Sequence, residues 1–229
     1  MFASFLNLIF PSVCCGCKQT LVQGEENLCV QCRFALPTFK NLGSDEKSIA
    51  IKFYGKVPIS QANAYLKFTR GGMVQTLLHE LKYNNRPEIG LLLGQMFGAE
   101  LAQIGYQQNI DLIVPVPLHA RKLSNRGFNQ CDGIAQGLSE SLGVAWNKTA
   151  LQKTKATASL SKQKMNTFER VEAVNNVFEI KETAPIYQKR IALIDDVITT
   201  GATLEACANS LLSAGAASVN ILCLAAKTL

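Results

Sequence analysis

The feature that most constrains the fold is a strand–helix–strand pattern near the end of the chain. The run RIALID (190–195) is almost continuously apolar, as expected for a strand buried on both faces of a sheet. Apolar residues then recur at helical spacing over 202–214, Gly215 ends this pattern, and SVNILCLAA (218–226) is a second apolar run. Two such strands joined by a helix pair in parallel through a right-handed crossover. The chain is therefore expected to have an α/β fold, with a mostly parallel sheet flanked by helices.

The preceding sequence fits the same class. Three further apolar runs predict strands at 62–68, 111–117 and 174–180. Three stripes at helical spacing predict helices over 73–81, 89–104 and 134–142, with Pro87 suited to a helix start and Gly143 to a helix end. We expect three regions: a cysteine module at 1–40, a linker with short strands at 41–70, and the α/β domain at 71–229.

Four cysteines near the start have the spacing of a metal site. Cys14, Cys17, Cys29 and Cys32 form two C-x2-C turns, and two such turns can complete a tetrahedral all-thiolate shell that suits a structural Zn²⁺. Cys15 is expected to be surplus to this site. Two disulfides are the alternative, but nothing in the sequence suggests an exported chain, so the cytoplasm is the expected location.

The charge and the hydropathy of the chain limit the classes of partner that it is expected to bind. The net charge is +6, and residues 111–170 hold nine basic and four acidic residues, which would attract phosphates or nucleic acid. The apolar start MFASFLNLIFPSV lacks a basic n-region and is not interpreted as a signal peptide. We expect no transmembrane segment there but a short docked helix, with a peripheral membrane contact as the alternative.

Two adjacent carboxylates end the strand at 190–195. Ligands of open α/β sheets bind at the carboxyl ends of the strands, which is where Asp195 and Asp196 fall. Adjacent side chains of a strand alternate between its faces, so both cannot face the core. A metal, or the vicinal hydroxyls of a ribose that donate to both, would relieve their repulsion.

The next residues suit a phosphate. A loop at a helix N-terminus offers free N–H groups, and hydroxyl donors and a permissive glycine add to them. This cradle is expected to consist of Thr199, Thr200, Gly201, Ala202 and Thr203. The sequence contains neither a P-loop nor a dinucleotide-binding motif. Carboxylates placed just before a phosphate cradle predict a site for a ribose 5-phosphate.

The stretch IALIDDVITTGAT (191–203) resembles the binding loop of type I phosphoribosyltransferases. VPVPLHARKLSNRGFNQ (114–130) and LLHELKYNNRPEIG (77–90) resemble segments of the ComF family, which is associated with competence and DNA uptake. The cysteine module, the order of these segments and the length agree as well. One departure is that residues 157–160 and 170–174 lack the amide side chains that this family often has there.

The resemblance implies a type I phosphoribosyltransferase-like fold and a Mg²⁺-dependent transfer from 5-phosphoribosyl 1-diphosphate (PRPP) to an acceptor. Asp195 and Asp196 would hold the ribose, and the loop with Arg121, Lys122 and Arg126 would stabilise the departing diphosphate. Ordinary surface charge is the alternative for these three cations. Lys82 and Tyr83 would close over the ligand, and 148–170 would form a hood or a nucleic-acid contact.

A second reading is a non-catalytic protein of the same family that binds single-stranded DNA or senses PRPP, and that contacts other competence proteins. Aromatic residues, which stack on single strands, make up only 7% of the chain. The intact acidic pair favours PRPP binding.

Overall fold

The computed structural model describes residues 11–39, 42, 49–154, 177–180 and 182–227. The expected N-terminal helix, the hood and the departures at 157–160 and 170–174 fall wholly or mostly outside these residues.

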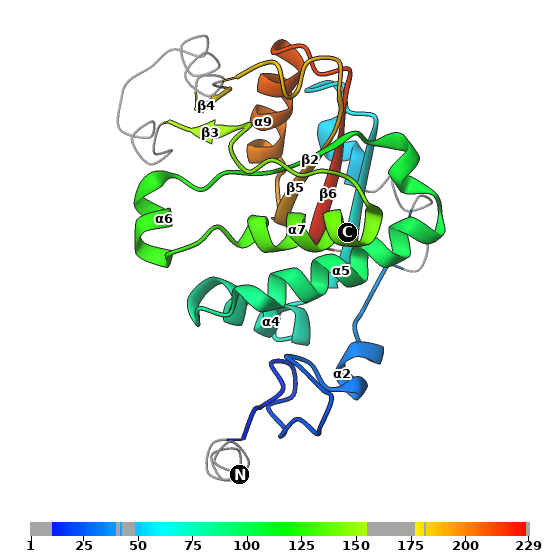
Figure 1. The fold of residues 1–229 in the computed structure, drawn as a ribbon, viewed down its shortest axis with the longest axis vertical. Coiled ribbons are helices and arrows are strands. Elements are labelled where there is room, and N and C mark those ends of the chain that lie inside the picture. Colours follow the sequence, from blue (N-terminus) through cyan, green and yellow to red (C-terminus); the bar gives the residue numbers. More distant parts are fainter. Residues whose placement is uncertain (1–10, 40–41, 43–48, 155–176, 181, 228–229) are drawn as a thin grey trace.

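A four-stranded parallel sheet forms the centre of the molecule, in the order β1-β6-β5-β2 (Figure 1). Its strands are β1 (Gln61–Phe68), β2 (Leu112–Pro115), β5 (Arg190–Ile198) and β6 (Ser218–Lys227). The middle strands β5 and β6 are buried along most of their length, which explains their continuous apolar runs. The expected mostly parallel α/β sheet is confirmed.

Helices cover both faces of the sheet (Figure 1). One face carries α4 (Met73–Tyr83), α5 (Pro87–Gln103) and α7 (Gln130–Leu142), and the other carries α9 (Ala202–Ser213). Two end signals predicted from sequence are confirmed: Pro87 lies in the first turn of α5, and Gly143 ends α7 in a left-handed conformation. Asn129 caps the start of α7. The expected crossover from β5 through α9 to β6 is present.

Short elements complete the chain. They are α2 (Val30–Phe34), η1 (Ile51–Phe53), η2 (Tyr106–Asn109), α6 (Ala120–Arg126), β3 (Gln152–Lys153) and β4 (Phe178–Glu179). Strand β4 lies in the run 174–180 that was expected to be a strand, but it pairs antiparallel with β3 in a separate two-stranded sheet and not with the main sheet. The partner of β4 could not be predicted, because the pattern of apolar residues within one strand does not show which other strand it pairs with.

Helices α5 and α7 approach each other unusually closely because glycines line their contact. A Cβ on Gly94 would lie 2.4 Å from the Ile134 carbonyl oxygen, and one on Gly137 would lie 2.3 Å from that of Leu91. Backbone therefore packs directly on backbone. This contact fixes α7, whose N-terminal end reaches the acidic pair of β5.

The cysteine module packs against the face of the domain that carries α4, next to that helix (Figure 1). Its buried residues share one apolar cluster with the helices: Cys14, Cys15, Leu28, Leu36, Leu77 and Leu81 all belong to it. The module is thus continuous with the core. Among the helices that the structure describes, none combines the length and apolar character needed to cross a membrane.

Candidate functional site

The acidic pair lies at the carboxyl end of β5, next to the start of the turn that leads into α9. Asp196 is only 5% exposed and Asp195 is partly buried. The backbone N–H of Asp196 donates to Oδ1 of Asp195 at 2.8 Å. Burial, and then the charge of Asp196, raise the pKa of Asp195 to about 7. Near neutral pH this carboxyl group can therefore take up or release a proton.

Each carboxylate has a partner from a different helix. Nζ of Lys82, in the last turn of α4, lies 2.7 Å from Oδ2 of Asp196. The Cys131 thiol, near the start of α7, donates to Oδ1 of Asp195 at 3.7 Å. Burial, followed by the charges of Asp195 and Asp196, raises the pKa of Cys131 well above its usual value, so it stays a thiol. Lys82 was expected to close over the ligand, but neither its contact with Asp196 nor that of Cys131 with Asp195 could be predicted, because each joins residues far apart in the chain.

The threonine–glycine turn encloses a small hollow directly after the acidic pair. Its volume is about 60 Å³, and it is lined by Asp195 and residues 197–204. Thr199, Thr200 and Thr203 are exposed, and Oγ1 of Thr200 accepts a hydrogen bond from the N–H of Ala202 at 3.4 Å. The hollow lies at the N-terminus of α9, where helix N–H groups have no partner within the helix. All five residues expected in a phosphate cradle thus line one hollow.

Gly201 is the cap residue of α9 and is required there for two reasons. Its φ of +84° lies in the left-handed region, and a Cβ at this position would be 3.1 Å from the ring of Phe53. Phe53 belongs to η1, in the region expected to be a linker, and its side chain is buried. The sequence therefore did not reveal that this segment supports the turn.

A second hollow, here called the basic groove, lies between the end of α4 and α6. It has a volume of about 460 Å³, and its lining residues are Lys82, Tyr83, Asn85, Lys122, Asn125, Arg126 and Phe128. This lining contains three cations, two amides and two aromatic rings, with no carboxylate. Lys82 also contacts Asp196, so the groove adjoins the acidic pair.

The three expected diphosphate-binding cations do not all reach the basic groove. Lys122 and Arg126 line it, whereas Arg121 is exposed on α6 and is not part of the lining. The guanidinium carbon of Arg126 lies 5.5 Å from the ring centroid of Tyr83, and its Nη1 donates to Oε1 of Gln130. Arg126 is thereby held in place by an aromatic ring and an amide.

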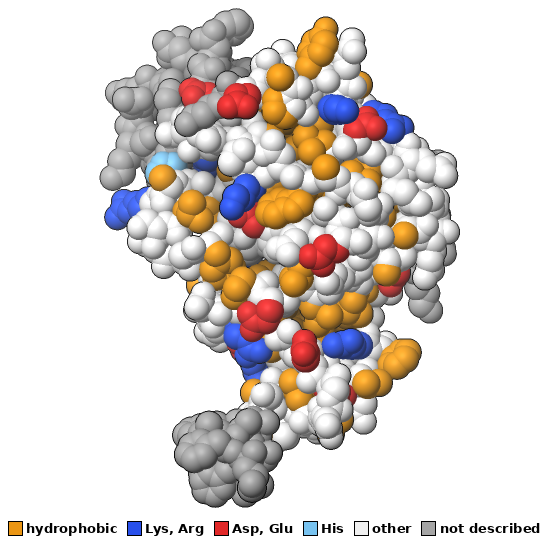
Figure 2. Space-filling view, in the orientation of Figure 1, with side chains coloured by type: hydrophobic (Ala, Val, Ile, Leu, Met, Phe, Trp, Pro, Cys, Tyr) orange, Lys and Arg blue, Asp and Glu red, His pale blue; other side chains and the backbone are white. Residues whose placement is uncertain are grey.

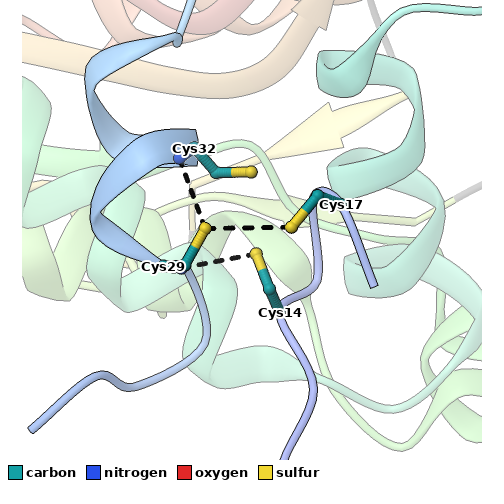
Figure 3. Close-up of side chains that lie close together, drawn as sticks. All are labelled: Cys14, Cys17, Cys29 and Cys32. Atoms are coloured by element: carbon teal, nitrogen blue, oxygen red, sulfur yellow. Dashed lines mark hydrogen bonds between the residues drawn. The ribbon is translucent and has the colours of Figure 1, made fainter. Parts of the chain in front are cut away.

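The four spaced cysteines converge on one point (Figure 3). Their sulfur atoms all lie within 4.8 Å of one another, and those of Cys17 and Cys29 are 3.8 Å apart. A tetrahedral ion with Zn–S bonds of about 2.3 Å requires sulfur atoms roughly 3.8 Å apart. The donor set and spacing therefore fit a metal ion such as zinc, and the four sulfurs are sufficient for a tetrahedral shell.

Backbone N–H groups support the thiolate form of these cysteines. Those of Gly16 and Cys29 donate to the Cys14 sulfur at 3.4 and 3.3 Å, and that of Cys32 donates to the Cys29 sulfur at 3.4 Å. Burial raises the pKa of Cys14, but these backbone donors outweigh it and the pKa falls to about 6. Burial and the neighbouring sulfurs raise the pKa of Cys32, so a bound cation would be needed to hold all four as thiolates.

Cys15 is not part of this cluster. It is 1% exposed and belongs to the apolar core that the module shares with α4 and α5. Its place outside the metal-binding group agrees with expectation, and it contributes to packing. Cys131, Cys207 and Cys223 are buried, as expected of small apolar residues.

Comparisons with known proteins place this geometry in context. No family model matches the sequence. The chain is 29% identical over 226 residues to "DNA utilization protein YhgH" of Escherichia coli K12, covering 95% of this chain and 98% of that protein. It is 25% identical to "Competence protein F" of Haemophilus influenzae, covering 84% and 87%. It is 35% identical to "Competence protein ComFC" of Streptococcus pneumoniae over 56% and 54% of the two chains.

Solved structures of phosphoribosyl enzymes are also similar. One is glutamine PRPP amidotransferase from B. subtilis, with a TM-score of 0.45 and 20% identity over 63% of this chain and 30% of that longer one. Another is purine phosphoribosyltransferase from Pyrococcus horikoshii, with a TM-score of 0.39 and 20% identity over 59% and 74%.

Proposed function

Because the chain belongs to the ComF family of competence-associated proteins, we propose that it binds PRPP with Mg²⁺ and transfers the phosphoribosyl group to a nucleophilic acceptor. The observation that carries the proposal is one continuous row of groups. The threonine–glycine turn, the acidic pair and the basic groove follow one another, and Lys82 joins the last two.

Each part of this row suits one part of PRPP. The 5-phosphate would lie in the turn 199–203, where hydroxyl and N–H donors surround a hollow of about 60 Å³. The ribose hydroxyls would donate to Asp195 and Asp196. The diphosphate would lie in the basic groove on Lys82, Lys122 and Arg126, which stabilise charge that grows on the leaving oxygen.

In the transfer, the bond from C1 to the diphosphate oxygen breaks, and a bond from C1 to the acceptor forms. Pyrophosphate leaves with the bonding electrons, and the acceptor loses its proton. Mg²⁺, when bound with PRPP, offsets the charge of the diphosphate. Asp195 and Asp196 would orient the ribose, and the cations of the basic groove would hold the leaving group in line.

The four-cysteine cluster would hold a structural Zn²⁺. Cys14, Cys17, Cys29 and Cys32 supply a closed shell of four sulfurs, which leaves no position for a reacting water. The metal would therefore contribute to stability and not to the chemical step.

The experiment for PRPP binding is a thermal shift measurement with Mg²⁺ and PRPP. We expect the melting temperature to rise, and the shift to disappear when Asp195→Asn and Asp196→Asn are combined. Asp111→Asn is the control, because Asp111 pairs with Arg190 at the opposite end of the sheet. An equal shift in the double variant would contradict the assignment. Pyrophosphate release with candidate bases then separates an enzyme from a protein that only binds.

A second candidate function, binding of single-stranded DNA without transfer, has one supporting observation. Tyr83, which is exposed, and Phe128, which is partly buried, line the basic groove beside its cations, and aromatic rings next to cations suit stacked bases. On the face drawn in Figure 2, however, the basic side chains are scattered among acidic ones and form no continuous track. Salt-dependent binding of an oligonucleotide, with no pyrophosphate release for any acceptor, would favour this candidate.

A further inference from the structure

The turn between α4 and α5 has two sides. Lys82, Tyr83 and Asn85 line the basic groove. Glu80 and Arg86 flank them and instead contact the cysteine module. The same short segment therefore forms a wall of the candidate ligand site and a docking surface for the module.

Two contacts fasten the module to this turn, and further hydrogen bonds hold the contacting residues in place. Lys18 forms an ion pair with Glu80, whose carboxylate also takes a hydrogen bond from the side chain of Asn84, the cap residue of α4. Nη2 of Arg86 donates to Oδ1 of Asn27 at 3.1 Å. The backbone of Asn27 in turn accepts from the N–H of Cys15, the buried cysteine, at 2.8 Å.

The module residues that make these contacts lie within the metal-binding loops. Lys18 directly follows Cys17, and Asn27 precedes Cys29 by two positions. Both have a positive φ, +65° for Lys18 and +60° for Asn27, a conformation that asparagine adopts readily but that is uncommon for lysine. A Cβ added to Gly16 would lie 3.0 Å from Sδ of Met73, the first residue of α4, so these loops also pack closely on the start of that helix.

We propose that the metal site of the cysteine module positions the turn 82–86, and through it Lys82 and the basic groove. The inference rests on the proposed function, because the groove is taken as the diphosphate site. Without a metal, the four cysteine sulfurs no longer hold the two loops together. Lys18 and Asn27 then lose the positions from which they contact the turn. Lys82 then lies less often beside Asp196. Metal loss should weaken PRPP binding by a factor of about 5 to 100, the usual range for coupled sites.

The first experiment compares the full-length protein in three states: zinc-loaded, stripped with a chelator, and reloaded. Calorimetry with Mg²⁺ and PRPP gives the dissociation constant, and hydrogen exchange reports on residues 79–86. We expect weaker binding and faster exchange of this turn in the stripped state, both reversed by zinc. Helix α9 is the internal control, because it packs on the other face of the sheet in a separate core cluster.

The outcomes separate this inference from the proposed function. If the loaded protein fails to bind PRPP while exchange of the turn still depends on zinc, the proposed function is wrong and the coupling stands. If PRPP binds equally well to both states and exchange is unchanged, the coupling is wrong.

A second experiment tests positioning without removing the metal. Lys18→Glu and Glu80→Lys should each weaken PRPP binding several-fold, and the double variant should restore it because the pair is re-formed with reversed charges. Zinc content should stay stoichiometric throughout. The matched control is the same reversal at Asp111 and Arg190, an ion pair remote from the turn. A lower melting temperature with unchanged affinity in the single variants would show a merely structural contact and overturn the proposal.

Discussion

Nζ of Lys82 lies 2.7 Å from Oδ2 of Asp196, although one residue lies in the last turn of a helix early in the chain and the other lies near the end of a strand late in the chain. The contact joins the basic groove to the acidic pair. It also offsets part of the repulsion between the two adjacent carboxylates. Among the described ion pairs, Asp195 has no basic partner of its own, so Lys82 supplies the positive charge for the pair.

Replacing this lysine should therefore affect both stability and binding. Lys82→Met leaves Asp196 almost buried without its cation, which should lower the free energy of unfolding by about 1–3 kcal/mol. PRPP binding should weaken at least tenfold because the groove also loses a charge. Adding Asp196→Asn should recover stability but not binding. Urea unfolding and calorimetry measure the two effects, and unchanged binding in Lys82→Met would exclude a role at the ligand.

The raised pKa of Asp195 predicts a pH dependence of stability. Its value is about 7 in the folded protein, against an ordinary 3.8. Between these values the folded state binds the extra proton, so the contribution of Asp195 to stability is full at low pH and is lost as pH rises towards 7. Asp195→Asn should remove this slope. Urea unfolding of both proteins from pH 5 to 8 measures it, and parallel curves would contradict the raised pKa.

The same group predicts proton release on ligand binding. Ribose hydroxyls that donate to Asp195 favour its charged form, so PRPP should bind more tightly as pH rises from 6 to 8. Calorimetry in two buffers of different ionisation enthalpy should detect up to about half a proton released at pH 7, where the free carboxyl group is half protonated, and up to about one proton near pH 6. The control is Asp111→Asn, which should release the same number. A proton count of zero in the wild-type protein would exclude Asp195 from the contact.

Substitutions can separate the cysteines expected to bind zinc from Cys15, which packs in the apolar core. Cys14→Ser and Cys29→Ser should lose stoichiometric zinc, since each removes one of four ligands. Cys15→Ser should retain zinc but lower the melting temperature, because it places a hydroxyl in the shared core. Metal analysis and thermal unfolding measure this. Loss of zinc in Cys15→Ser would contradict the placement of Cys15 outside the group of zinc ligands.

The contact between α5 and α7 predicts an unusual response to alanine. Glycine to alanine in a helix normally stabilises by up to about 1 kcal/mol. Gly94→Ala and Gly137→Ala should instead destabilise by about 1–3 kcal/mol, because each new Cβ would lie within 2.4 Å of a carbonyl oxygen on the other helix. Gly90→Ala, whose Cβ would meet atoms only at 3.3 Å, should cost less. Three equal effects in urea unfolding would refute the close approach.

Substitution of Gly201 tests whether the ring of Phe53 supports the turn that leads into α9. Gly201→Ala adds a clash with Phe53 to the strain of a positive φ, whereas Gly143→Ala at the end of α7 adds strain alone. We expect Gly201→Ala to weaken PRPP binding at least tenfold and Gly143→Ala to leave it unchanged. Thermal shift and calorimetry provide the comparison. Similar affinities in the two variants would mean that the turn tolerates displacement.

Much of the fold could be predicted because its signals are local. Buried parallel strands read as apolar runs, helices as stripes, and Pro87 and Gly143 mark helix ends through their own backbone preferences. The metal-binding cysteines were recognisable for the same reason, since each C-x2-C turn holds two sulfurs close together whatever the rest of the chain does. The partner of β4 was not, because strand pairing depends on residues distant in sequence.

The sequence by itself determined the parallel α/β class, four cysteines with the spacing of a metal site, and an acidic pair followed by a turn rich in hydrogen-bond donors. Only the tertiary structure decided that Lys82 meets Asp196, that Cys131 donates to Asp195, and that Phe53 lies beneath Gly201. It also separated Arg121 from the basic groove that contains Lys122 and Arg126. The physical reason is that backbone propensity and periodicity act over a few residues, whereas these contacts arise when helices pack on a sheet and bring distant side chains together.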